Sequence, residues 1–135
     1  METVRSFVAI LLAPAIQKNL GELQRRLRNA DLQVKWVAPE NIHLTLKFLG
    51  DVRTDRIAEI KTALSGVAAG CSKFEISVAG MGVFPDRRRP RIVWAGVREG
   101  KEELLRLARM IEDACVQAGC QKQERGFVAH LTIAR

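Results

Sequence analysis

The two histidines of this 135-residue chain each open the same short motif. His43 begins His-Leu-Thr-Leu, and His130 begins His-Leu-Thr-Ile. Because side chains alternate faces along a strand, each motif would place its histidine and threonine on one face and its apolar residues on the other. The apolar face would pack beneath helices and leave the imidazole and hydroxyl groups open. A lone histidine is more often structural, but a motif repeated around both histidines indicates a shared function.

Two opposed imidazoles suit a displacement at phosphorus. Near neutral pH, one imidazole can accept the proton of an attacking water while the other donates a proton to the leaving oxygen. Thr45 and Thr132 would donate hydrogen bonds to the phosphate oxygens on which charge accumulates. The formal net charge of +7 favours an anionic substrate. We therefore expect a cleft for one phosphate, built from His43, Thr45, His130 and Thr132.

The sequence offers no ligand set for a metal ion, and we expect no cofactor. Neither histidine has a second histidine or a cysteine at ligand spacing. Cys71, Cys115 and Cys120 show no Cys-x-x-Cys pattern, which indicates reduced cysteines in a cytoplasmic protein. The longest apolar run, residues 7–16, contains a proline and is about half as long as a membrane-spanning helix, so no membrane partner is expected.

Apolar periodicity predicts the elements that must position the motifs. In chain order they are a buried strand over 5–13, a helix from Pro14 that ends before Asp31, a short strand over 34–37, a turn at 39–41, a strand over 42–49 closed by Gly50, a helix with Thr54 as its N-cap, a strand over 74–78, a strand over 91–97, a helix closed by Gly119, and a strand over 127–135.

An internal repeat organises these elements. Arg5 precedes His43 by 38 residues, and Arg91 precedes His130 by 39. Each interval holds a strand, a helix and a strand that carries the motif. This pattern predicts an α+β fold that is bilobal and duplicated. Two antiparallel sheets would face a central cleft, with helices packed on the outside, in a single domain over residues 1–135.

Several side chains are open to two interpretations. Lys47 shares the face of His43 and would either add charge to the cleft or lie exposed on the strand. Phe84, Trp36 and Trp94 could stack on a base, although tryptophans in apolar strands are more often core residues. The basic run Arg87, Arg88, Arg89 and Arg91 would contact an RNA backbone or form a solvated loop, and we favour the loop.

On these motifs the sequence resembles the two-histidine (2H) phosphoesterases, and most closely the bacterial and archaeal RNA 2′,3′-cyclic phosphodiesterases, also called 2′-5′ RNA ligases. The resemblance covers almost the whole chain. It is carried by residues 7–10, 36–37, 39–41, 43–50, 82–85, 88–91 and 127–135.

The resemblance implies metal-independent hydrolysis of a 2′,3′-cyclic phosphate at an RNA end to a 2′-phosphomonoester. His43 would protonate the 3′-oxygen leaving group, and His130 would activate water. Thr45, Thr132 and Arg135 would hold the phosphate. Members of this family also join RNA ends weakly through 2′-5′ linkages.

Two features of the chain leave alternatives. Relatives continue beyond the second motif with a further helix and strand pair, so we expect the second lobe to be incomplete. Arg135 has the strand parity of Leu131 and Ile133, so a regular strand would direct it away from the cleft.

Two alternatives to this function remain. They are a non-catalytic RNA-binding module with the same cleft, and a phosphodiesterase for another cyclic phosphate or a 2′-5′-linked nucleotide.

Overall fold

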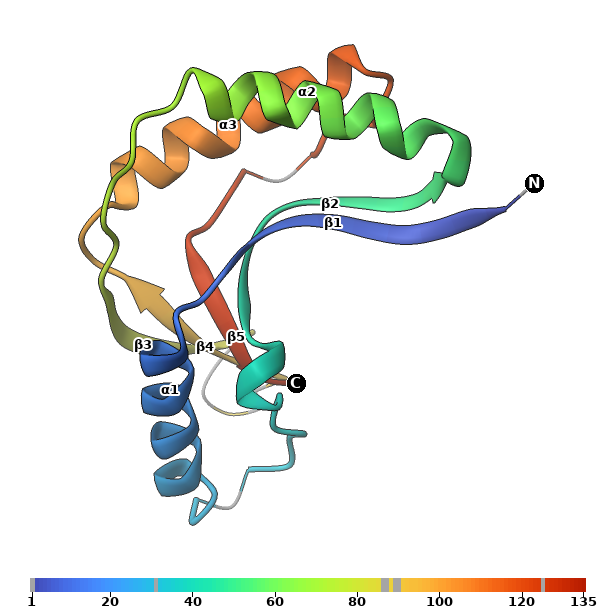
Figure 1. The fold of residues 1–135 in the computed structure, drawn as a ribbon. Coiled ribbons are helices and arrows are strands. Elements are labelled where there is room, and N and C mark those ends of the chain that lie inside the picture. The colour runs from blue at the N-terminus through green and yellow to red at the C-terminus, as the bar shows by residue number, and fades with distance from the viewer. Residues whose placement is uncertain (1, 31, 86–87, 89–90, 125) are drawn as a thin grey trace. The chain divides into compact units, whose positions relative to one another are not determined.

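The computed structural model describes residues 2–30, 32–85, 88, 91–124 and 126–135. Its elements, drawn in Figure 1, are β1 (Thr3–Leu11), α1 (Pro14–Leu27), η1 (Pro39–Asn41), β2 (His43–Arg53), η2 (Thr54–Arg56), α2 (Ile57–Ala69), β3 (Val78–Phe84), β4 (Ile92–Val97), α3 (Lys101–Gln117) and β5 (His130–Ala134). The strands form two sheets, β1-β2 and β3-β4-β5. The predicted α+β class with two small antiparallel sheets is confirmed.

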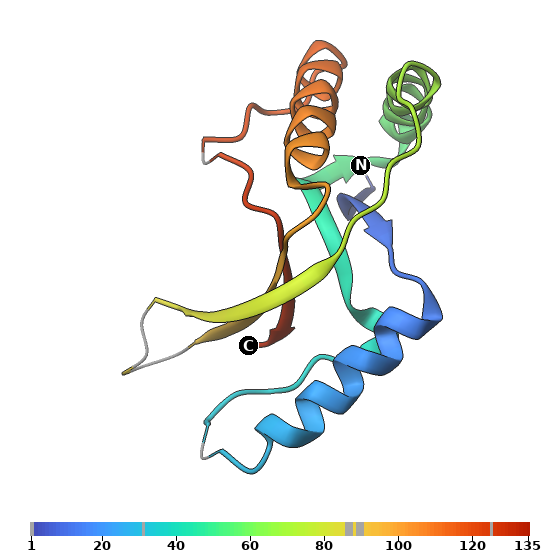
Figure 2. The ribbon, with the colours of Figure 1, turned by 90° about the vertical axis from the view of Figure 1, so that its left-hand side faces the viewer.

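The chain forms two compact units, and each is assembled from three separate stretches. Unit 1 consists of Met1–Ala9, Thr45–Ile76 and Gly100–Ala129, and unit 2 consists of Ile10–Leu44, Ser77–Glu99 and His130–Arg135. In unit 1, α2 and α3 lie side by side along one side of the β1-β2 sheet (Figure 1). In unit 2, β4 is the central strand between β3 and β5 (Figure 2).

Each sequence repeat has the order strand, helix, antiparallel strand. β1, α1 and β2 form the first, and β4, α3 and β5 form the second. The helices are exchanged between the units, because α1 belongs to unit 2 with β5 while α3 belongs to unit 1 with most of β2. The single-domain interpretation over residues 1–135 with two pseudo-repeated lobes stays a prediction.

The helices form where the sequence predicts them. Pro14 occupies the first turn of α1, where its missing N–H has no helical partner to lose. α3 buries Leu104, Ala108, Ile111 and Cys115 at helical spacing. Gly119 ends α3 with φ of +96°, a left-handed conformation that favours glycine.

The start of α2 differs from the prediction. Thr54 is not its N-cap, because the helix begins at Ile57 after the short η2 turn, and its N-cap residue Arg56 makes no side-chain capping bond. The backbone N–H of Thr54 instead donates to the carbonyl of Glu2, at 3.2 Å. This bond joins the end of β2 to the beginning of the chain, as antiparallel pairing requires.

Three predicted strands, over 34–37, 42–49 and 74–78, differ from the strands that form. β2 continues past Gly50 to Arg53, since glycine at φ of +70° turns the strand without ending it. The alternating residues before β3 form no strand, and β3 instead contains Gly80 and Gly82. Residues 34–37 contribute one isolated bridge, from Trp36 to Ala134.

β1 is not a buried strand. Phe7 is 46% exposed and Leu11 is 84% exposed. A continuous apolar run is typical of a strand covered on both faces, but β1 has only β2 as a neighbour in its sheet. In the part of the chain that is described, no helix is long and apolar enough to cross a membrane.

Candidate active site

The two motifs show the alternation that strand geometry predicts. The apolar residues are buried: Leu44, Leu131 and Ile133 are at 0% exposure, and Leu46 is at 5%. His43, Thr45, His130 and Thr132 are all half-buried. Each motif therefore fixes its strand by burying leucine or isoleucine while its histidine and threonine keep access to solvent.

Unit 2 contains three of the four motif side chains that could do chemistry. His43 lies in its Ile10–Leu44 stretch, and His130 and Thr132 lie in its last stretch. Thr45 is the first residue of the next stretch, which belongs to unit 1. At the entry into the first motif, η1 ends in a hydrogen bond from the Ile42 amide to the Pro39 carbonyl, at 3.2 Å, and Ile42 is buried.

Strand register defines the face around the second motif. In the antiparallel β4-β5 pair, Trp94 lies opposite Thr132, and Gly96 lies opposite His130. Directly opposite residues project from the same face of a sheet. His130, Thr132, Trp94 and Gly96 therefore share one face. The other face of β4 carries Val93, Ala95 and Val97, which are buried.

A register irregularity changes the position of Arg135. Thr132 pairs with Trp94, but Ala134 pairs with the very next residue, Val93, so Ile133 is an extra residue in β5. An extra residue reverses the alternation beyond it, and Ile133 and Ala134 are accordingly both buried. The regular strand that would direct Arg135 away from the histidine face therefore does not form, and the bulge brings this residue into phase with Thr132.

Backbone hydrogen bonds hold Arg135 in place. Its N–H donates to the carbonyl of Lys35 at 2.9 Å, and its carbonyl accepts from the N–H of Lys35 at 2.6 Å. The Val37 N–H donates to the Ile133 carbonyl at 3.0 Å. The segment before the first motif thus pairs with the strand of the second motif. The phosphate-binding role of Arg135 stays a prediction.

Lys47 does neither of the two things predicted for it. Its side chain is 1% exposed, and its Nζ donates to Glu112 Oε2 at 2.7 Å and to the Gln121 carbonyl at 3.0 Å. Burial raises the pKa of Glu112, but the Gln123 amide and the Lys47 ammonium outweigh it and hold this pKa below its usual value. Lys47 is a structural residue of unit 1.

The three cysteines are free, and one of them packs in the core. Cys115 is completely buried, and desolvation raises its pKa to about 11, with a further increase from Cys120 beside it. The Cys120 N–H donates to the Cys115 carbonyl at 2.8 Å and closes the end of α3. A thiol with a raised pKa is a poor nucleophile.

A pocket of about 420 Å³ lies in unit 1, and none of the predicted site residues lines it. It is lined by Leu46, Leu105, Ala108, Arg109, Glu112, Gln123, Glu124, Gly126 and Phe127. None of these is a histidine, and Glu112 is already bound to Lys47 and to the Gln123 amide. The pocket therefore lacks the acid–base groups of the motifs, and we place the candidate site on the histidine face.

Neither a metal site nor the basic run adds residues to this face in the part of the chain that the structure describes. The described residues contain no group of three or more His, Cys, Asp or Glu side chains that could hold a metal ion. In the basic run, Arg88 and Arg91 are exposed. Arg87 and Arg89 lie outside the described residues.

Comparison with known proteins identifies the class to which this fold and these motifs belong. Residues 10–94 match the family described as LigT like Phosphoesterase. The chain is 41% identical over 132 residues to the RNA 2′,3′-cyclic phosphodiesterase of Methanothermobacter thermautotrophicus, covering 98% of this chain and 71% of that protein. It is 37% identical to the protein of the same name from Aquifex aeolicus, covering all of this chain and 72% of that protein.

Solved structures agree with the sequence matches. The TT0787 protein of Thermus thermophilus has a TM-score of 0.81 at 28% identity, over 98% of this chain and 74% of that one. Escherichia coli LigT, in a complex with 3′-AMP, has a TM-score of 0.77 at 29% identity, over 99% and 74% of the two chains. The chain therefore belongs to the LigT-like family of two-histidine phosphoesterases.

Proposed function

We propose that this protein is an RNA 2′,3′-cyclic phosphodiesterase that hydrolyses a terminal 2′,3′-cyclic phosphate to a 2′-phosphomonoester. The observation that carries the proposal is the pair of His-Leu-Thr motifs, with both histidines half-buried in one compact unit. Relatives from several organisms bear this enzyme's name. A related structure holds a nucleoside 3′-phosphate. The proposal includes a cytoplasmic location, supported by the three free cysteines.

Displacement at phosphorus needs one proton acceptor and one proton donor, and the resemblance to the two-histidine family assigns these roles to His130 and His43. Water attacks the phosphorus on the side opposite the 3′-oxygen. His130 accepts the proton that the water loses, and His43 donates a proton to the 3′-oxygen as its bond to phosphorus breaks. The phosphate remains on the 2′-oxygen, and the two imidazoles have exchanged protonation states. If an RNA 5′-hydroxyl took the place of water as the nucleophile, the same two groups would form a 2′-5′ linkage while the bond from phosphorus to the 3′-oxygen breaks.

The threonines and the last arginine would stabilise the charge that gathers on the phosphate. Thr45 and Thr132 each offer one hydroxyl donor to a non-bridging oxygen. The bulge at Ile133 supports a role for Arg135, because it brings this residue into phase with Thr132. A guanidinium there would bind the phosphate through two parallel hydrogen bonds.

To test the proposal, the protein is incubated with a dinucleotide that ends in a 2′,3′-cyclic phosphate, in the presence of EDTA. The product is identified by phosphorus NMR. We expect a 2′-phosphomonoester, a bell-shaped pH dependence of kcat/KM, and a loss of about 10²- to 10⁴-fold in His43→Ala and in His130→Ala. Lys18→Ala, at an exposed position of α1, is the control and should retain full activity.

Two results would contradict this proposal. Activity that survives His43→Ala would exclude the acid–base mechanism. An absence of turnover, with salt-dependent RNA binding that both histidine substitutions leave unchanged, would favour a non-catalytic RNA-binding module. A panel of other cyclic phosphates and 2′-5′-linked dinucleotides tests the choice of substrate.

A further inference from the structure

Trp94 lies on the face of its sheet that carries His130 and Thr132, and not in the core. It is half-buried, whereas Val93 and Ala95 on either side of it are 0% and 2% exposed. Its cross-strand partner on β5 is Thr132. The sequence had favoured a core position for Trp94, and that was wrong, because the core face of β4 is the one opposite to it. Core packing therefore does not explain why an indole lies beside Thr132, a residue predicted to bind the phosphate.

Two glycines give the indole a flat floor. A Cβ atom at Gly82 would lie 2.2 Å from Trp94 Cζ2, and one at Gly96 would lie 3.5 Å from Trp94 Cζ3. Gly82 is the cross-strand partner of Trp94 on β3. The six-membered ring of the indole therefore leans from β4 towards β3, away from Thr132. Only glycine at position 82 allows the ring to lie so close to the backbone.

Phe84 extends this aromatic surface. It follows Gly82 by two residues on β3 and so projects from the same face. Its ring centroid lies 6.4 Å from that of Trp94, at an interplanar angle of 43°. Phe84 is 50% exposed, although it is a large apolar side chain. An aromatic pair with one exposed and one half-buried ring, next to polar site residues, is typical of a stacking surface.

The span of the sheet fits a nucleoside phosphate. Neighbouring strands are about 4.8 Å apart, so Thr132 on β5 and Gly82 on β3 are separated by about 10 Å across β4. A phosphate at Thr132 would leave its ribose above β4 and direct its base over the indole. Trp94 Nε1 is buried and has no hydrogen-bond partner among the described residues. The indole therefore offers a ligand its ring and not its donor.

We propose that Trp94 and Phe84 stack on the base of the terminal nucleoside that carries the cyclic phosphate, over the floor left by Gly82 and Gly96. This inference rests on the proposed function and adds the subsite that the base occupies. Because no donor of the indole faces the base, recognition is by stacking. It therefore accepts all four bases and binds purines more tightly than pyrimidines.

The test compares two substrates, adenosine 2′,3′-cyclic phosphate and the 1-O-methyl riboside 2′,3′-cyclic phosphate, which has no base. In Trp94→Leu and Phe84→Leu we expect KM for the adenosine substrate to rise about 5- to 100-fold, with kcat little changed. Kinetics on the riboside should be the same as in the wild type. Trp94→Phe should recover part of the affinity. Phe84 is exposed, so its variant tests the inference even if Trp94→Leu fails to fold.

Phe48→Leu is the matched control. Phe48 is 61% exposed and forms a similar tilted pair with Phe7, with centroids 6.3 Å apart at 47°, but its parity in β2 is that of Leu44 and not of His43. It should leave both substrates unaffected. An equal loss on both substrates in Phe84→Leu, or no loss on either, would overturn the stacking inference while the wild-type turnover still supports the proposed function.

A direct binding measurement separates the two proposals if neither substrate is hydrolysed. Trp36 and Trp94 are the two tryptophans of the chain. In Trp36→Phe the emission of Trp94 can be followed alone during titration with adenosine 3′-monophosphate. If adenosine 3′-monophosphate quenches the emission of Trp94 and ribose phosphate does not, the result supports stacking independently of turnover. Unchanged emission at saturating nucleotide would contradict it.

Discussion

The two units of this protein stabilise a strand–helix contact in different chemical ways. Lys47 and Gln24 are the buried polar side chains in the described part of the chain. In unit 1, Lys47 of β2 forms an ion pair with Glu112 of α3. In unit 2, Gln24 of α1 donates from Nε2 to the Val37 carbonyl at 2.6 Å and to the Ile133 carbonyl of β5 at 3.0 Å.

Both contacts join a strand of one repeat to the helix of the other. The ion pair holds charges whose removal from water costs free energy, whereas the amide is neutral. Breaking a charged contact leaves a partner that burial penalises strongly, and breaking a neutral one leaves an unpaired carbonyl. Unit 1 should therefore be more vulnerable than unit 2 to a single substitution and to a fall in pH.

The largest effect is expected for Lys47→Met, which keeps the length of the side chain and removes its charge. Glu112 would remain ionised in a largely buried position, and the Gln121 carbonyl would lose its donor. Loss of one partner of a buried pair typically costs about 3–5 kcal/mol. Since the Glu112 side chain is 23% exposed, we expect about 3 kcal/mol, measured by urea denaturation.

The double variant Lys47→Met/Glu112→Gln is the control for that prediction. It removes both charges and should recover part of the lost free energy of unfolding. A loss below about 1 kcal/mol in the single variant would show that the pair is no stronger than a surface salt bridge.

The second prediction tests the neutral contact of unit 2. Gln24→Met keeps the volume and leaves the Val37 carbonyl without the Gln24 donor, while the Ile133 carbonyl still accepts from the Val37 amide. A buried carbonyl that loses its partner costs about 1–3 kcal/mol. Gln33→Met, at an exposed position, should change the free energy of unfolding by less than about 0.5 kcal/mol. A loss as large as that of Lys47→Met would remove the distinction between the units.

The two contacts also show what the sequence can predict. Gln24 lies four residues after Leu20, so helical spacing is compatible with its burial, although that burial was not predicted. Lys47 gave no such signal, because its partner Glu112 is 65 residues away. Local periodicity placed the three helices, β4 and the two motifs. Features that depend on a neighbouring strand, such as the bulge at Ile133, could not be predicted from it.

The site was predictable to the same extent. A motif repeated around both histidines indicated acid–base chemistry without any knowledge of contacts. The aromatic surface depends instead on cross-strand register, which brings Gly82 and Thr132 to the two sides of Trp94. Small residues beside a tryptophan are a signal only when the strands that carry them are known to be neighbours.

A third prediction concerns pH. The folded-state pKa of Glu112 is lowered, because the Gln123 amide and the Lys47 ammonium outweigh the opposing effect of burial. Its ionisation therefore contributes stability that is fully present above the unfolded pKa, about 4.5, and is lost as pH falls through the folded pKa. We expect the free energy of unfolding to fall below pH 4.5 less steeply in Glu112→Gln than in the wild type.

Gln24→Met serves as the matched comparison for this pH dependence. It carries no titrating group, so its stability curve should run parallel to that of the wild type between pH 3 and 7, displaced by a constant amount. Parallel curves for Glu112→Gln as well would show that the acid sensitivity arises from other carboxylates.

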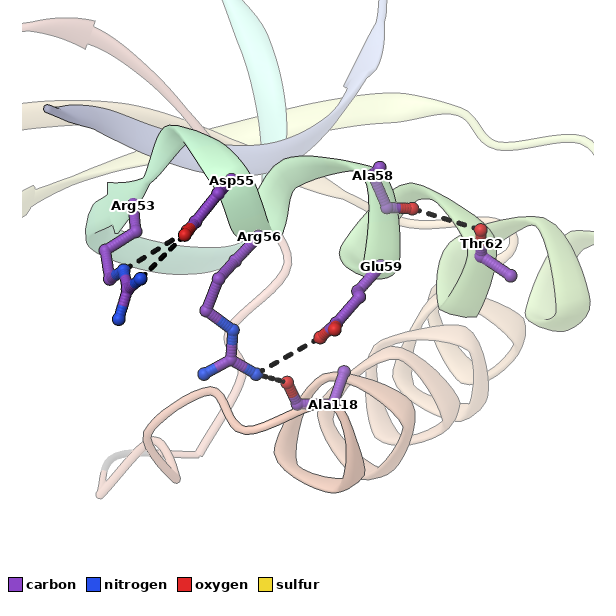
Figure 3. Close-up of polar contacts among 7 residues, drawn as sticks. All are labelled: Arg53, Asp55, Arg56, Ala58, Glu59, Thr62 and Ala118. Carbon is purple, nitrogen blue, oxygen red and sulfur yellow. Dashed lines mark hydrogen bonds and ion pairs between the residues drawn. The ribbon is translucent and has the colours of Figure 1, made fainter.

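The smallest effect is expected at the contact between α2 and α3 in unit 1, drawn in Figure 3. Arg56 Nη2 donates to the Ala118 carbonyl at the end of α3, and it also lies 3.4 Å from Glu59 Oε2. Arg53, on the same segment, forms an ion pair with Asp55 at 2.6 Å, but both of these side chains are at least half exposed. Of these two arginines, Arg56 is therefore the one that binds the end of a neighbouring helix.

Arg56→Ala should lower the free energy of unfolding by about 1 kcal/mol, because it removes a charged donor from a helix-end carbonyl that is partly shielded from water. Arg53→Ala should cost less than about 0.5 kcal/mol, since an exposed pair gains little over hydration. Both are measured by urea denaturation beside Lys47→Met. If Arg56→Ala cost as much as Lys47→Met, the α2–α3 contact and not the buried ion pair would dominate the stability of unit 1. Equal small losses at both arginines would instead leave Lys47 and Glu112 as its main polar contact.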